Sequence, residues 1–113
     1  MQAVLDDPAE RDYRVFEAPV SGIRENNQKI RYFNFISSLK NRDCNEALKR
    51  IVPRVNMNEI MDLIDGTPFI SDLQKRFYKT MLAERKERIL DFSLTKLLKR
   101  ERKREAARCP LAP

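Results

Sequence analysis

The stretch from Gly66 to Lys79 constrains the fold of this chain more than any other, because it ends one helix and starts the next. Gly66 follows an apolar stripe of helical spacing and is expected to be a left-handed C′ residue, since it has no Cβ to clash. Pro68 cannot donate a backbone hydrogen bond, so the first helix cannot continue through it. Ser71, with Gln74 three residues later, has the pattern of a capping box. The stretch therefore predicts a tight corner between two helices, of which the second is longer.

Other helix boundaries in the chain carry the same kind of signal. Asp43 with Glu46, and Asn56 with Glu59, each have the spacing of a capping pair at a helix start. Between these boundaries, apolar residues recur at intervals of three and four, which is the period of an amphipathic helix. The sequence predicts an all-α fold, a small bundle of four to five helices joined by short capped turns.

The chain divides by sequence into three parts. Residues 1–28 are interrupted by prolines and polar runs and are expected to be extended or irregular, with a short extended segment at 13–16 whose partner lies outside this chain. Residues 29–92 form the helical domain, and residues 93–113 a basic helical extension that frays into a tail. The apolar positions beyond residue 90 are out of phase with the preceding stripe, so either the helix bends near Ser93 or a second short helix begins.

Composition excludes several kinds of site, because histidine, the commonest general base and a frequent metal ligand, is absent. The two glycines, Gly22 and Gly66, are too far apart to form a glycine-rich phosphate loop. Cys44 and Cys109 are interpreted as two unpaired thiols. No catalytic residue, cofactor-binding residue or metal ligand is therefore predicted. One alternative is a weak cation site formed by three aspartates near the corner, Asp62, Asp65 and Asp72.

The sequence gives no sign of a membrane segment or a secretion signal. It has no run of about 18 apolar residues, and its start lacks a basic region followed by an apolar one. Two unpaired cysteines suit a reducing compartment. The expectation is a cytoplasmic protein.

Positive charge is concentrated near the C-terminal end. The chain holds 23 Lys and Arg against 17 Asp and Glu, and residues 96–108 alone carry seven basic and two acidic side chains. Such a run is either a solvated helix end with local ion pairs or a nonspecific contact for nucleic acid. No aromatic residue lies from residue 93 onward, so sequence-specific binding of single strands is poorly supported. The candidate nucleic-acid-binding residues are Lys96, Lys99, Arg100, Arg102, Lys103, Arg104 and Arg108.

Aromatic residues gather at two places within the helical domain. Their helical spacing is what an ordinary core produces. The alternative is that they anchor a partner protein or a second copy, and it gains if the chain is a fragment whose covering surface is missing. The candidate partner-binding residues are Tyr32, Phe33, Phe35, Phe77 and Tyr78.

A family resemblance runs through the helical domain. It rests on residues 32–36, 46–51 and 74–90, and most strongly on Asn58-Glu59-Ile60-Met61-Asp62-Leu63-Ile64-Asp65 followed by Thr67-Pro68-Phe69-Ile70-Ser71. These segments resemble the C-terminal helical region of HipA-like protein kinases, the kinase-fold proteins of bacterial toxin–antitoxin systems and their relatives. The resemblance implies a helical unit that packs at the end of the helical lobe and does not hold the phosphates. No segment matches the catalytic aspartate, the magnesium-binding residues or the ATP-contacting lysine of the family.

The sequence therefore predicts a non-catalytic helical module or fragment that acts through protein association, with no small-molecule substrate and no membrane partner. The alternative is a small basic protein that binds nucleic acid through residues 96–108. A third possibility is a chain that is enzymatic only when it is joined to an absent kinase core.

Overall fold

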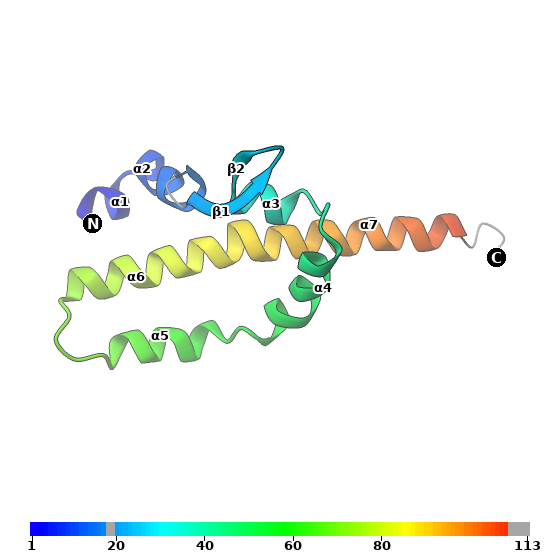
Figure 1. Cartoon of the computed structure of the whole chain (residues 1–113). Helices are drawn as coiled ribbons and strands as arrows, with labels where there is room; N and C mark the ends of the chain where they lie inside the picture. Colours follow the sequence, from blue (N-terminus) through cyan, green and yellow to red (C-terminus); the bar gives the residue numbers. More distant parts are fainter. Residues whose placement is uncertain (18–19, 109–113) are drawn as a thin grey trace.

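The computed structural model describes residues 1–17 and 20–108 (Figure 1). Cys109, and with it the predicted tail to Pro113, lies outside the described residues. The all-α prediction is confirmed, with one small two-stranded sheet added. In chain order the elements are α1 (Gln2–Asp6), α2 (Pro8–Asp12), the π-helix η1 (Tyr13–Glu17), β1 (Val20–Glu25), β2 (Gln28–Arg31), α3 (Tyr32–Ser37), α4 (Arg42–Ile51), the 3₁₀-helix η2 (Val52–Arg54), α5 (Met57–Asp65), α6 (Asp72–Arg85), the π-helix η3 (Lys86–Asp91) and α7 (Phe92–Arg108).

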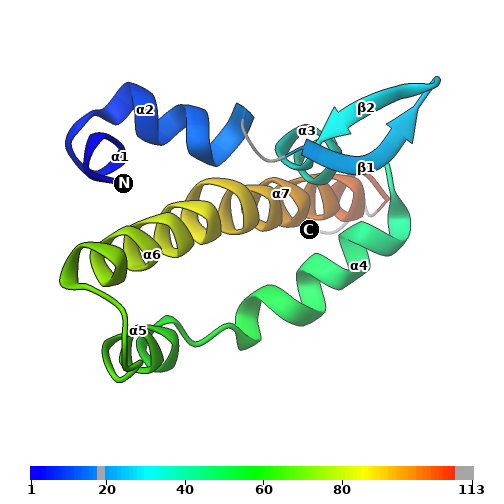
Figure 2. The same ribbon diagram turned by 60° about the vertical axis from the view of Figure 1, so that its left-hand side comes forward.

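One long helical rod forms the axis of the molecule. α6, η3 and α7 follow one another without a break from Asp72 to Arg108, which at 1.5 Å per residue is about 55 Å. This length accounts for most of the longest dimension of the molecule, 60 Å. The N-terminal helices, the hairpin and α3 lie along one side of the rod, and α4 and α5 lie along the other (Figures 1 and 2).

The π-helical stretch η3 explains the shift in apolar phase along the rod. The buried residues Met81, Ile89, Ser93 and Leu97 are spaced by multiples of four. In an unbroken α-helix each step of four residues turns the side chain by about 40°, so the stripe would wind away from the core. The wider turns of η3 rotate it back. The helix therefore continues through Ser93, and neither predicted alternative, a bend there or a new short helix, is needed.

The core consists of two small clusters that lie on different parts of the rod. The first joins the N-terminal segment to the rod and contains Val4, Val15, Met81 and Ile89. The second joins α4 and the connection before it to the rod and contains Leu39, Leu48, Val52 and Leu97. The partly buried side chains of Ile36 and Leu90 pack against both clusters. Each cluster thus fixes one part of the chain to the rod.

The N-terminal segment differs from its predicted extended form. Residues 2–6 and 8–17 are helical, as α1, α2 and η1. Asp7 caps α2 by accepting a hydrogen bond from the Ala9 amide at 2.9 Å, and Pro8 occupies the first helical position. Val15 is only 1% exposed in the first cluster, so the partner that the sequence places outside the chain lies within it. These helices are too short to show an apolar period, which is why the pattern does not reveal them.

The hairpin of β1 and β2 was also not predicted. Glu25 pairs with Gln28, and the two residues between them, Asn26 and Asn27, have positive φ values of 51° and 66°. Two central residues of positive φ define a type I′ turn, a conformation that asparagine tolerates well. The polar run that suggests irregular structure is therefore the turn of a hairpin.

Two predicted helix starts are confirmed. The Ser71 hydroxyl accepts a hydrogen bond from the Gln74 amide at 3.0 Å, and the Gln74 side chain accepts one from the Ser71 amide at 2.8 Å. This reciprocal pair is a complete capping box at the start of α6. The Asn56 side chain accepts from the Glu59 amide at 3.1 Å and caps α5.

The roles predicted for two other residues at helix boundaries, Asp43 and Gly66, are wrong. Asn41 caps α4, by accepting from the Cys44 amide at 2.9 Å, whereas Asp43 lies inside the first turn, where its charge suits the helix N-terminus. Gly66 has a φ of −83° and is not left-handed. The left-handed residue of the α5–α6 connection is Phe69, with a φ of 68°.

The molecule is open for its size. Its radius of gyration is 17.5 Å, whereas a compact domain of this length has one of about 13 Å. Its accessible surface is 8359 Å², against roughly 6,500 Å² for a folded monomer of this mass. The excess is larger than the area of about 800 Å² that one partner contributes to a standard interface. The chain therefore exposes more surface than a compact monomer of this mass does.

Candidate functional site

Acidic side chains near the α5–α6 corner serve the fold. The Asp65 carboxylate lies 2.7 Å from Lys79 Nζ, and the Asp65 carbonyl accepts a hydrogen bond from Lys75 at 2.8 Å. Among the described residues, no group of three or more His, Cys, Asp or Glu side chains is placed to hold a metal ion. The alternative of a cation site at Asp62, Asp65 and Asp72 therefore gains no support from the geometry.

The first set of candidate partner-binding rings lies partly in the core. Phe33 stands edge-on to Phe16, with ring centroids 4.9 Å apart, and its centroid is 5.8 Å from that of Phe92. Phe35 is half-buried, and Tyr32 is exposed. Tyr32 is thus the member of this set with the most accessible ring.

The second set, Phe77 and Tyr78, borders a groove of about 490 Å³ that lies between α6, the end of α5 and the N-terminal segment. The two rings are 5.9 Å apart between centroids. Tyr32 and Phe33 line a different pocket, of about 250 Å³, so the five candidate rings do not form one surface. The apolar lining of the larger groove includes Ile64, Ile70, Phe77, Tyr78, Met81 and Leu82.

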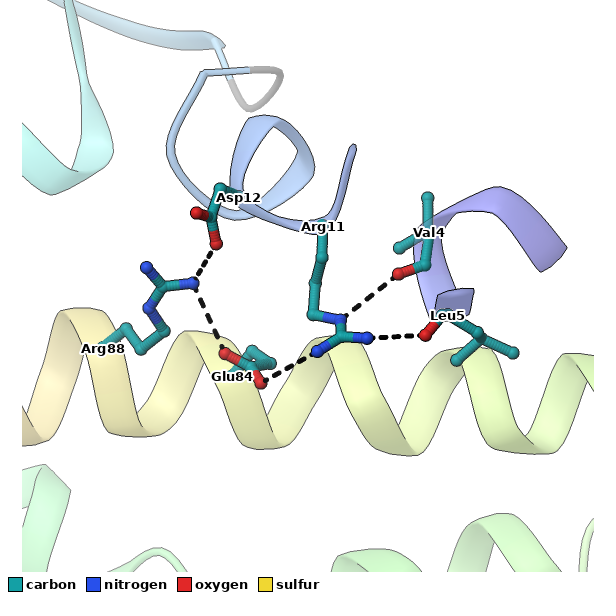
Figure 3. A network of polar contacts seen from close by, with 6 residues as sticks. All are labelled: Val4, Leu5, Arg11, Asp12, Glu84 and Arg88. Atoms are coloured by element: carbon teal, nitrogen blue, oxygen red, sulfur yellow. Dashed lines mark hydrogen bonds and ion pairs between the residues drawn. The ribbon is translucent and has the colours of Figure 1, made fainter. Parts of the chain in front are cut away.

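A network of polar contacts holds the N-terminal segment over α6 (Figure 3). The Arg11 guanidinium donates to the carbonyls of Val4 and Leu5 at 3.2 Å and 2.5 Å, and lies 3.9 Å from the Glu84 carboxylate. These contacts give two carbonyls at the end of α1 a hydrogen-bond donor and attach α1 to the rod. The segment then supplies Arg14 to the wall of the larger groove.

Arg88 completes this network from the rod side (Figure 3). It donates to Asp12, lies 3.6 Å from Glu84, and stacks 4.6 Å from the centre of the Phe16 ring. The hydrogen bond to Asp12 raises the pKa of the Arg88 guanidinium above its ordinary value. No local pattern in the sequence could reveal these contacts, because Arg88 and Asp12 are 76 positions apart.

The seven candidate nucleic-acid-binding residues fall into two groups. Lys96 donates to the Ser37 carbonyl at 2.7 Å, and Arg100 donates to the Leu39 carbonyl at 3.1 Å, so these two residues fasten the α3–α4 connection to α7. The other five are exposed, and their side chains form no ion pair or hydrogen bond with another described residue: Lys99, Arg102, Lys103, Arg104 and Arg108.

Two further titratable groups lie on α4. Lys49 Nζ is 2.9 Å from a Glu101 oxygen and 3.1 Å from a Glu46 oxygen, and hydrogen bonds to Glu101 and then to Glu46 raise the pKa of Lys49. Cys44 is a free, half-buried cysteine whose pKa is raised by burial. Its thiol is therefore protonated near neutral pH, which argues against a nucleophilic role.

Comparison with known proteins relates this fold to an enzyme class. No protein-family model matches the chain. The chain is homologous to one segment of a serine/threonine-protein kinase. That relative is CtkA of Helicobacter pylori (strain J99), to which the chain is 42% identical over 98 residues, 86% of this chain and 30% of CtkA.

The structural comparison leads to the same enzyme. The crystal structure of a H. pylori proinflammatory kinase CtkA matches with a TM-score of 0.84 and 40% identity, covering 88% of this chain and 37% of that chain. The predicted resemblance to part of a kinase is confirmed at this level, and the chain spans less than two fifths of the kinase. In the described part of the chain, no helix is long and apolar enough to cross a membrane.

Proposed function

We propose that this chain is a non-catalytic helical module of a HipA-like serine/threonine kinase, and that it acts by packing against the catalytic core of such a kinase. The observation that carries the proposal is the match of 88% of this chain to 37% of a solved kinase, with a TM-score of 0.84. The open shape supports it, since the radius of gyration is 17.5 Å and large apolar side chains such as Leu63 and Phe69 are exposed.

The position within such a kinase follows from the family resemblance. Residues 30–90 resemble the C-terminal helical region of HipA-like kinases, so the proposal places this module after the catalytic residues. A link to toxin–antitoxin systems follows from the same resemblance and belongs to the proposal. The cytoplasmic location belongs to it too, and it rests on the sequence signals and on the two cysteines.

The non-catalytic part of the proposal has a direct test. Phosphoryl transfer needs ligands for Mg²⁺, groups that hold the phosphates, and an aspartate for the nucleophile. The purified 113-residue chain is expected to transfer no phosphate from labelled Mg-ATP to itself or to a generic protein substrate. Magnesium-dependent transfer that a single Asp→Asn substitution abolishes would contradict the proposal.

The packing part is tested by a chimaera in which this chain replaces the matched segment of CtkA. The chimaera is expected to be soluble, to unfold in one cooperative transition and to transfer phosphate from ATP. A CtkA variant in which a flexible Gly/Ser linker replaces the same segment is the control, and it is expected to be inactive. If the chimaera behaves like the linker control, the proposed function is wrong.

A second candidate function is favoured by one specific observation, the five exposed basic side chains of α7 that form no ion pair with a described residue. These residues suit a nonspecific contact with nucleic acid, in which each neutralised phosphate steepens the salt dependence of binding. Fluorescence anisotropy with a labelled duplex would show an affinity that falls steeply with salt. Neutralising Lys99, Lys103 and Arg104 to Gln is expected to weaken this binding and to reduce its salt dependence. Lys96 and Arg100 are kept because they hold the α3–α4 connection against α7.

A further inference from the structure

The connection between α5 and α6 presents Phe69 in an unusual way. Its side chain is fully exposed, at 103% of the reference area, and its backbone has a φ of 68°. Large residues rarely adopt this left-handed conformation, which is commonest for glycine and asparagine. An exposed ring gains no burial that offsets such strain within this chain. Both the strain and the exposure are therefore unexplained by the contacts of the chain itself.

The rest of the connection holds Phe69 in this conformation. The Thr67 hydroxyl donates to the Leu63 carbonyl at 2.7 Å, before Pro68, and the capping box of Ser71 follows. Lys79 closes the corner from α6 by its ion pair with Asp65. Strain that is fixed by its surroundings in this way recurs at ligand clamps and binding sites. The ring is thus presented on a braced loop.

Apolar surface continues on both sides of Phe69. Leu63, in the last turn of α5, is 72% exposed, and α5 contributes no fully buried residue. Thr67 and Ile70, which lie two positions before and one after Phe69, line the groove of about 490 Å³, whose lining also includes the exposed side chains of Tyr78 and Leu82. A protruding ring beside an apolar groove is a common arrangement at the centre of protein interfaces.

The geometry points to this corner, with Phe69 as its anchor, as the surface on which the catalytic core of a serine/threonine kinase docks. The inference rests on the proposed function and adds the residues that make the contact. The size of the missing partner supports it, because the solved kinase has about three fifths of its chain outside the part that this chain matches. The excess of exposed surface, beyond the roughly 6,500 Å² of a compact monomer, supports it also.

Substitutions at Phe69 test the inference in two settings. In the isolated chain, Phe69→Gly is expected to leave the melting temperature within about 2 °C or to raise it, because strain is relieved and no ring contact is lost. In the CtkA chimaera, the same substitution is expected to lower the melting temperature and to reduce phosphate transfer at least about tenfold, the size of effect typical of an anchor residue. Phe69→Tyr, which keeps the ring, is the matched control and is expected to preserve both properties.

The outcomes separate this inference from the proposed function. A wild-type chimaera that fails to fold overturns the proposed function and the inference with it. An active chimaera that is insensitive to Phe69→Gly overturns the inference alone. The inference is also overturned if Phe69→Gly lowers the melting temperature of the isolated chain as much as that of the chimaera, because Phe69 would then be a structural residue of this chain. Sedimentation of the isolated chain is expected to show a monomer, and a dimer that Phe69→Gly dissociates would assign the corner to a second copy instead.

Discussion

Two connections between helices in this chain use the same strained backbone in opposite settings. Leu39, between α3 and α4, and Phe69, between α5 and α6, are large apolar residues with left-handed φ values of 60° and 68°. Leu39 is 4% exposed, and its carbonyl accepts hydrogen bonds from Asn45 and Arg100. Phe69 is fully exposed.

The difference shows which of the two connections has its backbone strain offset by contacts within the chain. A residue held in the left-handed region costs about 1–3 kcal/mol. At Leu39 this cost is offset by burial in the second core cluster and by the hydrogen bonds of its carbonyl. At Phe69 no comparable contact is present among the described residues. The strain of the α3–α4 connection is therefore offset within the chain. The strain at Phe69 is not, and this is why we propose that the α5–α6 connection is one side of an interface.

The largest expected effect comes from shortening the two side chains. Leu39→Ala keeps the Cβ, and so the strain, but removes buried methyl groups, and is expected to lower the free energy of unfolding by about 2–4 kcal/mol. Phe69→Ala in the isolated chain is expected to change it by less than about 0.5 kcal/mol. Urea denaturation followed by circular dichroism measures both. Equal losses at the two sites would remove the contrast between them.

A smaller effect is expected from the hydrogen bonds at the Leu39 carbonyl. Arg100→Met keeps most of the apolar stem of the side chain but removes its donor, and is expected to cost about 1 kcal/mol. Arg104→Met is the matched control on the exposed side of α7, and thermal unfolding should place it within about 0.5 kcal/mol of wild type. Equal stabilities of Arg100→Met and Arg104→Met would show that Arg100 does not stabilise the α3–α4 connection.

Phe69→Gly and Leu39→Gly should change the free energy of unfolding in opposite directions. Relief of the left-handed strain favours the variant by about 1–2 kcal/mol, and the greater freedom of glycine in the unfolded chain opposes it by about 0.5–1 kcal/mol. The free energy of unfolding of the isolated chain should therefore rise by about 0–1.5 kcal/mol in urea unfolding, whereas Leu39→Gly should be strongly destabilising. A clear loss with Phe69→Gly would mean that the ring has contacts within the chain.

The smallest effect concerns pH and the ion pairs beside the Leu39 connection. Hydrogen bonds to Glu101 and Glu46 raise the pKa of Lys49 in the folded chain above the ordinary 10.5. The contribution of these hydrogen bonds to the stability of the fold is therefore present below pH 10.5 and is lost as the pH rises through the pKa of Lys49 in the folded chain. The difference in melting temperature between wild type and Lys49→Met should be constant near neutral pH and shrink above about pH 10.5. A difference that grows with alkaline pH would have the wrong sign.

Local chemistry made part of this fold predictable from sequence. The Ser71–Gln74 box and the Asn56 cap are formed by residues three positions apart, so their pattern is visible in the chain. The corner at residues 66–71 and the all-α class follow from the same kind of signal. The kinase resemblance rests on these same helices.

Other features depend on contacts that no local pattern contains. The N-terminal helices are attached to the rod by the Arg11–Glu84 and Arg88–Asp12 contacts, each of which joins residues more than 70 positions apart. The π-helix η3 is compatible with the same residues as an α-helix. The sequence predicts the positive φ at Gly66, because glycine adopts it most easily. The structure places it at Phe69. The candidate basic residues include Lys96 and Arg100. Only the structure shows that these two side chains hold the α3–α4 connection by hydrogen bonds to its carbonyls.

Hydrogen-exchange mass spectrometry of the free chain and of the CtkA chimaera tests the central claim most directly, because it reports on both connections at once. The account predicts that amides of residues 57–71 exchange readily in the free chain and become protected in the chimaera. Amides of residues 39–52 should be protected to a similar degree in both. Unchanged exchange at residues 57–71 in a folded, active chimaera would contradict the claim that a kinase core completes this corner.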